Sequence, residues 1–453
     1  MSKFLFSEFE GTSPAAWKQK IQVDLKGADY NETLLWKTNE GITVKPFYTK
    51  EDRTHNDLNL PKENYKICQT IIVDNEHQAN TFANDVLKRG ATAIQFVLNK
   101  KIDFKALLHN IDFNQINTYF KFHFLDDAFI IAIAEYVDSK KCFYQIDILG
   151  NLAESGNWYV NLKEDHKKLE KIVASLDNAI SVSGDLFQNA GANNTQQLAY
   201  TLAQANEYLN HFGVENAHKI HFQFSVGSNY FFEIAKLRAF RMLWKALLLE
   251  YGIQDKEAHL FVQPSKRNKT LYDYNVNMLR TSSECMSAVL GGANTISNVS
   301  YDSVYAKSNE FGERISRNQL LILQQESGFE DAQYFADGSY YIESLTDQIA
   351  EKALEIFKLI EKSGGFLKNL KEGTIQRKLK ESANKEEEEF NKKEIILLGT
   401  NLQSNKDNFM KDVIQTDPFI KQRNIKTLFP PLIRKRLSEN LEKKRLKEES
   451  SSC

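Results

Sequence analysis

The alternation of short apolar runs with longer amphipathic segments most restricts how this 453-residue chain can fold. Runs rich in β-branched and aromatic residues predict strands, at residues 93–98, 129–134, 143–148, 180–183, 221–226 and 259–262. Helical spacing between them is clearest at Leu198, Leu202, Ala205 and Leu209. The alternation covers a span close to the ~250 residues of a (β/α)8 barrel, so it predicts that α/β fold. Periodicity alone leaves a doubly wound sheet as the alternative.

Three regions are predicted along the chain. Residues 1–60 have no sustained period and are interpreted as an extended arm, which must find apolar partners elsewhere. Residues 61–365 carry the barrel pattern, with further helices at 234–248 and at 349–360, the latter ending at two glycines that accommodate a left-handed cap. Residues 366–453 form a charged linker and short helical tail. Its apolar block at 419–433 is expected to pack onto something, whereas 434–453 is expected to fray.

Composition excludes several classes of protein. The net charge is −2, and basic and acidic residues are interspersed, so no phosphate-tracking basic face is visible and nucleic-acid binding is not favoured. The cysteines, Cys68, Cys142, Cys285 and Cys453, lack the paired spacing of a zinc site or redox couple. Residues 1–10 contain no basic region followed by an apolar run. A cytoplasmic protein with reduced thiols is therefore expected.

Several motifs follow one another in an order typical of a known family. Residues 36–49 read W-K-T-N-E-G-I-T-V-K-P-F-Y-T, and residues 181–191 read S-V-S-G-D-L-F-Q-N-A-G. L-R-T at 279–281, a double glycine at 291–292, R-I-S-R-N at 314–318, Q-E-S-G at 325–328 and G-S-Y-Y-I-E-S-L-T at 338–346 come next. Together these segments resemble the methylmalonyl-CoA mutase family from the amino terminus to about residue 365. The resemblance implies a barrel, and it favours that fold over the doubly wound sheet.

The positions that carry chemistry in the family differ here. Its S-I-S-G-Y-H loop contributes a Tyr and a His, and the matching residues are Asp185 and Leu186. The family's substrate-contacting His after the double glycine matches Ser297, and the Arg of its W-T-I-R-Q segment matches Cys68. There is no Arg between Arg89 and Arg238 to serve as the family's carboxylate clamp. No catalytic residue is therefore predicted in this chain.

The cofactor is also expected elsewhere. Catalytic chains of the family carry a flavodoxin-like domain in which the His of a D-x-H-x-x-G motif is the lower cobalt ligand. After residue 365 this sequence has neither that motif nor any His, so no complete cobalamin-binding domain is predicted. The resemblance implies a non-catalytic small subunit in a heterodimer. Its large partner would hold adenosylcobalamin and interconvert methylmalonyl-CoA with succinyl-CoA, while the arm wraps across it.

Two other functions stay open: an autonomous enzyme with a rebuilt barrel mouth, and a regulatory subunit that binds an acyl-CoA without reacting it. Titratable candidates for a rebuilt site are Asp185, Glu284 and Glu326, but no nucleophile and base pair is evident.

Other residues of types that can carry chemistry are expected to have structural roles. His218 and His221 lack a third ligand, so no metal site is predicted. Five further residues are expected to be structural: Cys285 as a core residue, Gly291-Gly292 as a tight backbone approach, and Arg314 and Arg317 as ion-pair partners.

Overall fold

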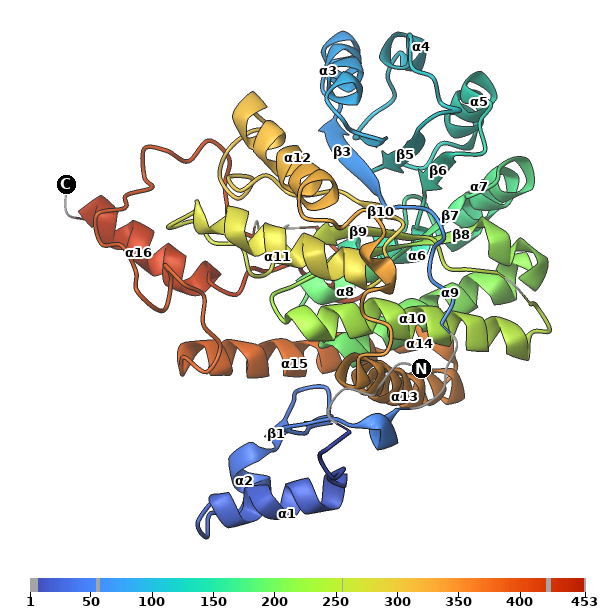
Figure 1. Ribbon diagram of the computed structural model, residues 1–453. Helices are drawn as coiled ribbons and strands as arrows, with labels where there is room; N and C mark the ends of the chain where they lie inside the picture. Colours follow the sequence, from blue (N-terminus) through green and yellow to red (C-terminus); the bar gives the residue numbers. More distant parts are fainter. Residues whose placement is uncertain (1–6, 54–57, 255, 421–424, 452–453) are drawn as a thin grey trace.

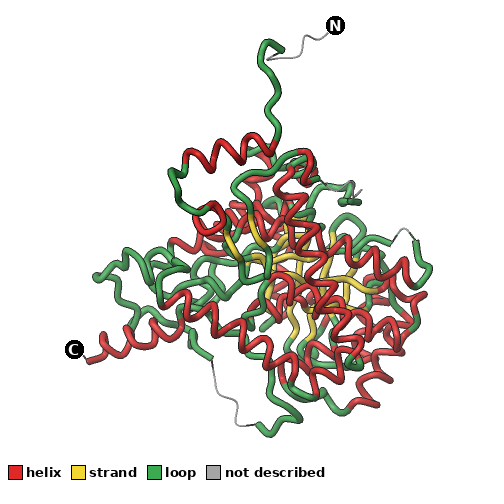
Figure 2. The backbone as a smooth tube through the Cα atoms, turned by 90° about the horizontal axis from the view of Figure 1, so that it is seen from below, coloured by secondary structure: helices red, strands yellow, loops and turns green. Residues whose placement is uncertain are grey.

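The computed structural model describes residues 7–53, 58–254, 256–420 and 425–451 (Figure 1). Eight parallel strands form one curved sheet in the order β6-β5-β4-β3-β10-β9-β8-β7. The strands are β3 (Lys66–Ile72), β4 (Ala93–Leu98), β5 (Asn117–Phe122), β6 (Cys142–Gln145), β7 (Ile180–Ser183), β8 (Ile220–Val226), β9 (Leu260–Pro264) and β10 (Thr295–Ile296). Helices surround the strands in both views (Figures 1 and 2). The fold is therefore the predicted α/β barrel, nearly closed, and not a doubly wound sheet.

Helices cover the outside of the sheet. They are α3 (Glu76–Lys88), α4 (Phe104–Leu107), α5 (Asp127–Val137), α6 (Ile148–Ser155), α7 (Leu162–Ser175), α8 (Gly184–Asn189), α9 (Asn194–Phe212), α10 (Tyr230–Glu250), α11 (Val276–Leu290), α12 (Glu310–Gln325) and α13 (Tyr340–Lys362), with 3-10 turns η2 (Val214–Lys219) and η3 (Ala332–Tyr334). Outward-facing strand residues such as Ile67, Phe96 and Val262 are fully buried against them in the main apolar core. No helix in the described ranges has the length and apolar character needed to cross a bilayer.

The seam between β6 and β7 closes the barrel without a regular ladder. Two backbone hydrogen bonds cross it, from Tyr144 N to Asn178 O and from Ser181 N to Ile146 O, both 2.9 Å long. The buried carboxylate of Asp147 adds a bond from the backbone N of Ser183, at 2.8 Å. Its other oxygen accepts from Gly150 N, Gln204 Nε2 and Tyr208 Oη, each at 2.7 Å. One side chain thus joins the end of β6 to β7, α6 and α9.

Most predicted elements are confirmed, with one clear error. The helices at 198–209, 234–248 and 349–360 are α9, α10 and α13, and Gly364 after α13 has a φ of +106°. Residues 129–134, predicted as a strand, lie inside α5. A short run that is apolar throughout has no distinguishing period, and the Asp126 carboxylate caps this one as a helix by accepting from Phe129 N. Strand β6 also ends earlier than predicted, at Gln145, because Asp147 caps α6.

The first part of the chain extends away from the barrel (Figure 1). It contains α1 (Pro14–Asp24), α2 (Tyr30–Leu34), a hairpin of β1 (Trp36–Lys37) and β2 (Thr43–Val44), and the turn η1 (Lys50–Asp52). Helix α1 buries none of its residues. The hairpin docks on the barrel through the buried Ile42 and through Trp36 against Phe232, and the segment after it contacts α13, where Arg53 pairs with Glu343 at 2.8 Å.

The tail packs against the barrel, so the expectation that 434–453 frays is wrong over the described residues. After α14 (Gly365–Lys371) and α15 (Thr374–Asn391), the chain crosses the barrel and ends in α16 (Glu439–Ser451). Buried Phe429 and Leu432 confirm the packing expected for the apolar block. Glu439 and Glu442 of the charged segment are also buried, and Glu442 accepts a bond from Leu271 N at 2.8 Å. The charged composition suggested a solvated end, but these charges are paired within the fold, so the segment packs against the barrel.

Candidate functional site

Aromatic side chains occupy the lumen near the amino-terminal ends of the strands. Tyr119, Phe143 and Phe261 pack with Cys68 and Ala93 in a cluster separate from the main core. The Tyr119 and Phe143 rings stack with centroids 4.9 Å apart. The Tyr119 hydroxyl lies 2.8 Å from His259 Nε2 and 2.7 Å from Thr295 Oγ1. This layer is a packed floor.

A layer of glutamines lies above that floor. Gln95 Nε2 donates to Gln145 Oε1 at 2.6 Å, and Gln95 Oε1 accepts from the Thr70 hydroxyl at 2.7 Å. Gln223 Nε2 donates to Ser181 Oγ at 2.6 Å, while Gln263 Nε2 reaches Thr70 Oγ1 at 3.3 Å. Because Gln95 lies on β4 and Gln145 on β6, this bond passes over the intervening strand β5 on the lumen side. Side chains that bond one another therefore occupy the middle of the lumen.

Asp185 lies at the carboxyl-terminal mouth, where it binds Arg434 from the tail. Arg434 Nη1 donates to Asp185 Oδ2 and Arg434 Nε donates to Glu154 Oε1, both at 2.6 Å. Burial alone would raise the pKa of Asp185, but the charges of Arg434 and Lys121 outweigh it and hold that pKa below its usual value. Asp185 thus forms a salt bridge at the mouth.

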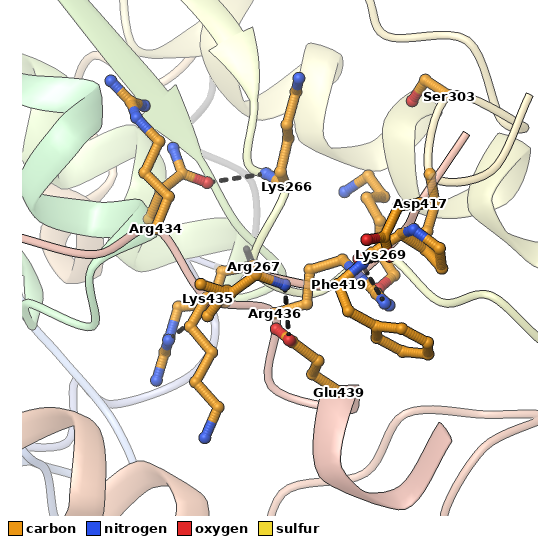
Figure 3. Close-up of a pocket in the computed structure, with 14 residues that line it drawn as sticks. Lys266, Arg267, Lys269, Ser303, Asp417, Phe419, Arg434, Lys435, Arg436 and Glu439 are labelled. Atoms are coloured by element: carbon orange, nitrogen blue, oxygen red, sulfur yellow. Dashed lines mark hydrogen bonds between the residues drawn. The ribbon is translucent and has the colours of Figure 1, made fainter. Parts of the chain in front are cut away.

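The segment that carries Arg434 is fixed by its backbone. Leu428 N donates to Gly156 O, and Leu432 N donates to Ala153 O. Lys435 N donates to Asn189 O, and Leu437 N donates to Arg267 O. We call residues 425–437 the strap. It borders a cleft of about 200 Å³ in which most side chains are charged (Figure 3).

The other degenerate positions lie inside the protein. Leu186 is fully buried in the main core between sheet and helices. Cys68 and Ser297 come together in the lumen, where burial raises the pKa of the Cys68 thiol and a hydrogen bond from Ser297 opposes that shift. The Ser297 hydroxyl is also 2.7 Å from that of Thr70. Among these positions only Asp185 carries an ionisable group at the mouth, and its charge is neutralised.

The histidines singled out from sequence are apart. His221 is buried in the lumen with its ring beside Phe143, and His218 lies nearer the surface, 3.9 Å from Asp177. Within the described ranges, no three His, Cys, Asp or Glu side chains gather as metal ligands do.

The candidates for a rebuilt site are dispersed. Glu284 is buried and ion-paired with Lys269 at 2.7 Å, whereas Glu326 is exposed after α12. Cys285 is a buried core residue, as expected.

The structure corrects the interpretation of two arginines. Neither Arg314 nor Arg317 forms an ion pair within the described part of the chain. Instead Arg314 lies over the Phe311 ring, and Arg317 Nη1 donates to Gln69 Oε1 at 3.0 Å. The tight approach expected at the double glycine is confirmed, since a Cβ on Gly292 would lie 2.8 Å from Leu60 Cδ2.

The residues of this barrel do not fit the cobalamin cofactor that the mutase resemblance implies. A corrin and a thioester would need an open mouth, but the strap carries Arg434 to Asp185 there. The lumen residues behind it bond one another. We therefore assign the residues of this chain no step in the chemistry of that cofactor.

Sequence alone missed the glutamine layer and the strap. The signal for the strap was the apolar block before Arg434, which indicated docking but not where the arginine would lie. The signal for the glutamine layer was a Gln inside each of four predicted or observed strands, Gln95, Gln145, Gln223 and Gln263.

Comparison with known proteins places the chain in a family. A sequence model described as "Methylmalonyl-CoA mutase" matches residues 73–450. The "Methylmalonyl-CoA mutase small subunit" of Porphyromonas gingivalis is 34% identical over 440 residues, covering 88% of this chain and 70% of that protein. The "Methylmalonyl-CoA mutase" of Cereibacter sphaeroides is 28% identical, covering 85% of this chain but only 64% of its own length. A DHPS structure from Yersinia pestis, at 14% identity, covers 58% of this chain and 94% of its own with a TM-score of 0.30, too low to support an argument. The chain belongs to the methylmalonyl-CoA mutase family.

Proposed function

We propose that this chain is the small, non-catalytic subunit of a heterodimeric, adenosylcobalamin-dependent methylmalonyl-CoA mutase in the cytoplasm. The large subunit would hold the cofactor and the CoA thioester and interconvert methylmalonyl-CoA with succinyl-CoA. The small subunit would support the fold and assembly of its partner.

The barrel mouth is the observation that carries the proposal. Radical chemistry on a thioester needs a water-excluded cavity large enough for both reactants. Here the guanidinium of Arg434 occupies the mouth between Asp185 and Glu154, and glutamine side chains that bond one another lie in the lumen. At the position of the family's catalytic His, Leu186 lies in the main core. The mouth is therefore occupied by an internal ion pair, and the position of the family's His is packed inside the fold.

The proposed domain division gives the two ends of the chain different roles. Residues 1–60 would contact the large subunit, residues 61–365 would form the degenerate barrel, and residues 366–453 would close its mouth. Trp17 and Val23 of α1 are 49% and 68% exposed. Burial against a partner subunit would remove these side chains from water.

Mutase activity measured with adenosylcobalamin tests the proposal. The assay uses this chain alone, the large subunit from the same source alone, and their mixture, with size-exclusion chromatography alongside. We expect no turnover by this chain, a 1:1 complex, and turnover by the mixture. Turnover by the isolated chain would refute a non-catalytic role, and failure to form a complex would refute the subunit role.

Ligand protection distinguishes the acyl-CoA-binding alternative. The isolated chain is heated with and without methylmalonyl-CoA, and Tm is compared. The filled lumen predicts no concentration-dependent rise. A saturable rise would favour the regulatory subunit instead.

A further inference from the structure

A second cleft lies at the amino-terminal face of the barrel, opposite the strap. It has a volume of about 460 Å³ and lies between the segment that enters the barrel, helix α10 and the loop before β9. Its lining residues are Leu58, Asn59, Leu60, Lys62, Arg241, Met242, Lys245, Lys256, Glu257, Ala258 and Tyr334. Four of these are cationic and one is anionic.

Arg241 is the buried cation of this cleft, only 4% exposed. Its Nη1 donates to Ala258 O at 2.8 Å, and its Nη2 donates to Gly292 O at 2.6 Å and to Asn294 Oδ1 at 2.8 Å. All three acceptors are neutral, and Nε has no hydrogen-bond partner. Burial lowers the pKa of Arg241 to about 10, and Glu257 opposes that shift only in part. Within the described residues the guanidinium is held in place by neutral groups and forms no ion pair.

The lysines around Arg241 add to the excess of positive charge in this cleft. Lys62, Lys245 and Lys256 are exposed, and among residues 7–53, 58–254, 256–420 and 425–451 no carboxylate forms an ion pair with any of them. Glu257 is the only acidic residue in the lining. A buried charge without a partner is costly, and an anion beside it would offset that cost.

The cleft beside the strap provides an internal comparison (Figure 3). It is also rich in cations, but Arg267, Lys269, Arg434, Lys435 and Arg436 each pair with a carboxylate. In that cleft the chain supplies the anions for these five cations. At the opposite face no carboxylate of the described residues forms an ion pair with Arg241, and an anion from solution would supply the negative charge that it lacks.

We propose that the cleft at Arg241 binds a phosphate-bearing anion. Lys62, Lys245 and Lys256 would contact the phosphate oxygens as point charges, and Arg241 would supply positive potential from below. Leu58, Met242 and Tyr334 form an apolar wall that an organic group on the phosphate could contact. The site is independent of the mutase reaction proposed above.

Calorimetric titration of the full chain with inorganic pyrophosphate at low ionic strength tests the site. We expect saturable 1:1 binding that is weakened about tenfold or more by the double substitution Lys245→Ala with Lys256→Ala. The matched control is Lys266→Ala with Lys435→Ala, which removes the same charge from the cleft beside the strap and should leave the affinity unchanged. Absence of saturable binding, or equal weakening by both doubles, would overturn the proposal.

Arg241→Met supplies a second test, through thermal unfolding. Pyrophosphate should raise Tm of the wild type and have no effect on this variant, while sodium chloride at equal ionic strength should not reproduce the rise. An equal rise in both proteins would contradict the site. Should Arg241→Met fail to fold, the lysine doubles still decide the question. If a nucleoside diphosphate binds more tightly than pyrophosphate, the apolar wall contacts the organic group. If the two bind equally, the site binds free phosphates.

Discussion

At the scale of single residues, charges far apart in sequence decide the character of the barrel mouth. Asp185 and Arg434 are 249 positions apart, yet their side chains are 2.6 Å apart. The sequence reveals that a family His is replaced by Leu186, because a motif fixes that position. It does not reveal that Arg434 neutralises the neighbouring carboxylate, because no local pattern couples residues from two distant segments. The contact between Cys68 and Ser297 in the lumen could not be predicted either, because the register of the strands decides which residues face the lumen.

Asp185→Asn should destabilise the chain in a pH-dependent way. The side chains of Asp185 and Arg434 are 13% and 30% exposed, so we expect a loss of about 1–2 kcal/mol in the free energy of unfolding at pH 7. The pKa of Asp185 is lower in the folded chain than the ~3.9 of an unfolded one, so the pair stabilises the fold above about pH 4. That contribution is lost as the pH falls through the lower, folded-state pKa.

Urea unfolding of wild type and Asp185→Asn at pH 7 and at pH 3 measures this difference. The gap between the two proteins should narrow at the lower pH. A gap that is constant or wider at pH 3 would mean that the carboxylate charge contributes nothing.

Leu186→His should fail to restore catalysis. The side chain lies fully buried in the main core, where an imidazole leaves packing defects and unpaired nitrogens. We expect a loss of about 2–4 kcal/mol in unfolding free energy and no mutase turnover by the variant chain alone. Chemical unfolding and the turnover assay check the two parts. Leu186→Met is the matched control and should cost less than ~1.5 kcal/mol.

At the scale of elements, apolar periodicity was a good guide to long helices and a poor one to short runs. Helices α9, α10 and α13 carry a clear period of 3.6 and were predicted. Residues 129–134 are apolar at every position, so only their Asp126 cap could have marked them as helical. The seam between β6 and β7 could not be predicted from the sequence for another reason. Its closure depends on Asp147 meeting Gln204 and Tyr208 of α9, which is a tertiary contact.

Asp147→Asn should weaken the seam specifically. The carboxylate accepts from four donors, and an amide nitrogen would face at least one of them without accepting. We expect a loss of about 2–3 kcal/mol in unfolding free energy. Hydrogen exchange should quicken first at the backbone N–H groups of Tyr144 and Ser181, which cross the seam.

The control for this substitution is Asp74→Asn, since Asp74 is exposed. It should change the unfolding free energy by less than ~0.5 kcal/mol. Uniform acceleration of exchange around the barrel in Asp147→Asn would contradict a local role at the seam.

At the scale of the molecule, two ends of one chain have opposite relations to the barrel. The tail is tied down by backbone bonds and buried charges, whereas α1 and α2 extend into solvent (Figure 1). The arm was predicted because its aromatics had no periodic element to join. Its stacking of Trp17 on Phe47, with ring centroids 4.4 Å apart, leaves the indole half exposed.

Trp17→Ala should weaken assembly with the large subunit while leaving the stability of the isolated chain nearly unchanged. The indole is 49% exposed, so we expect a change below ~1 kcal/mol in the unfolding free energy of the isolated chain. Affinity for the large subunit should fall tenfold or more if this aromatic is an interface anchor. Analytical ultracentrifugation of the mixture measures the affinity. Ile322→Ala on α12, 47% exposed, is the control and should leave the affinity unchanged; an equal loss in both variants would refute a special role for the arm.

The strap also imposes an order on synthesis. A ribosome completes all eight strands well before it reaches Arg434, because the last of them, β10, ends at Ile296. Until the strap emerges, the carboxylates of Asp185 and Glu154 face each other at the mouth without their guanidinium. The nascent barrel thus passes through a stage with an unsealed opening, and the residue that seals it is translated only after all eight strands.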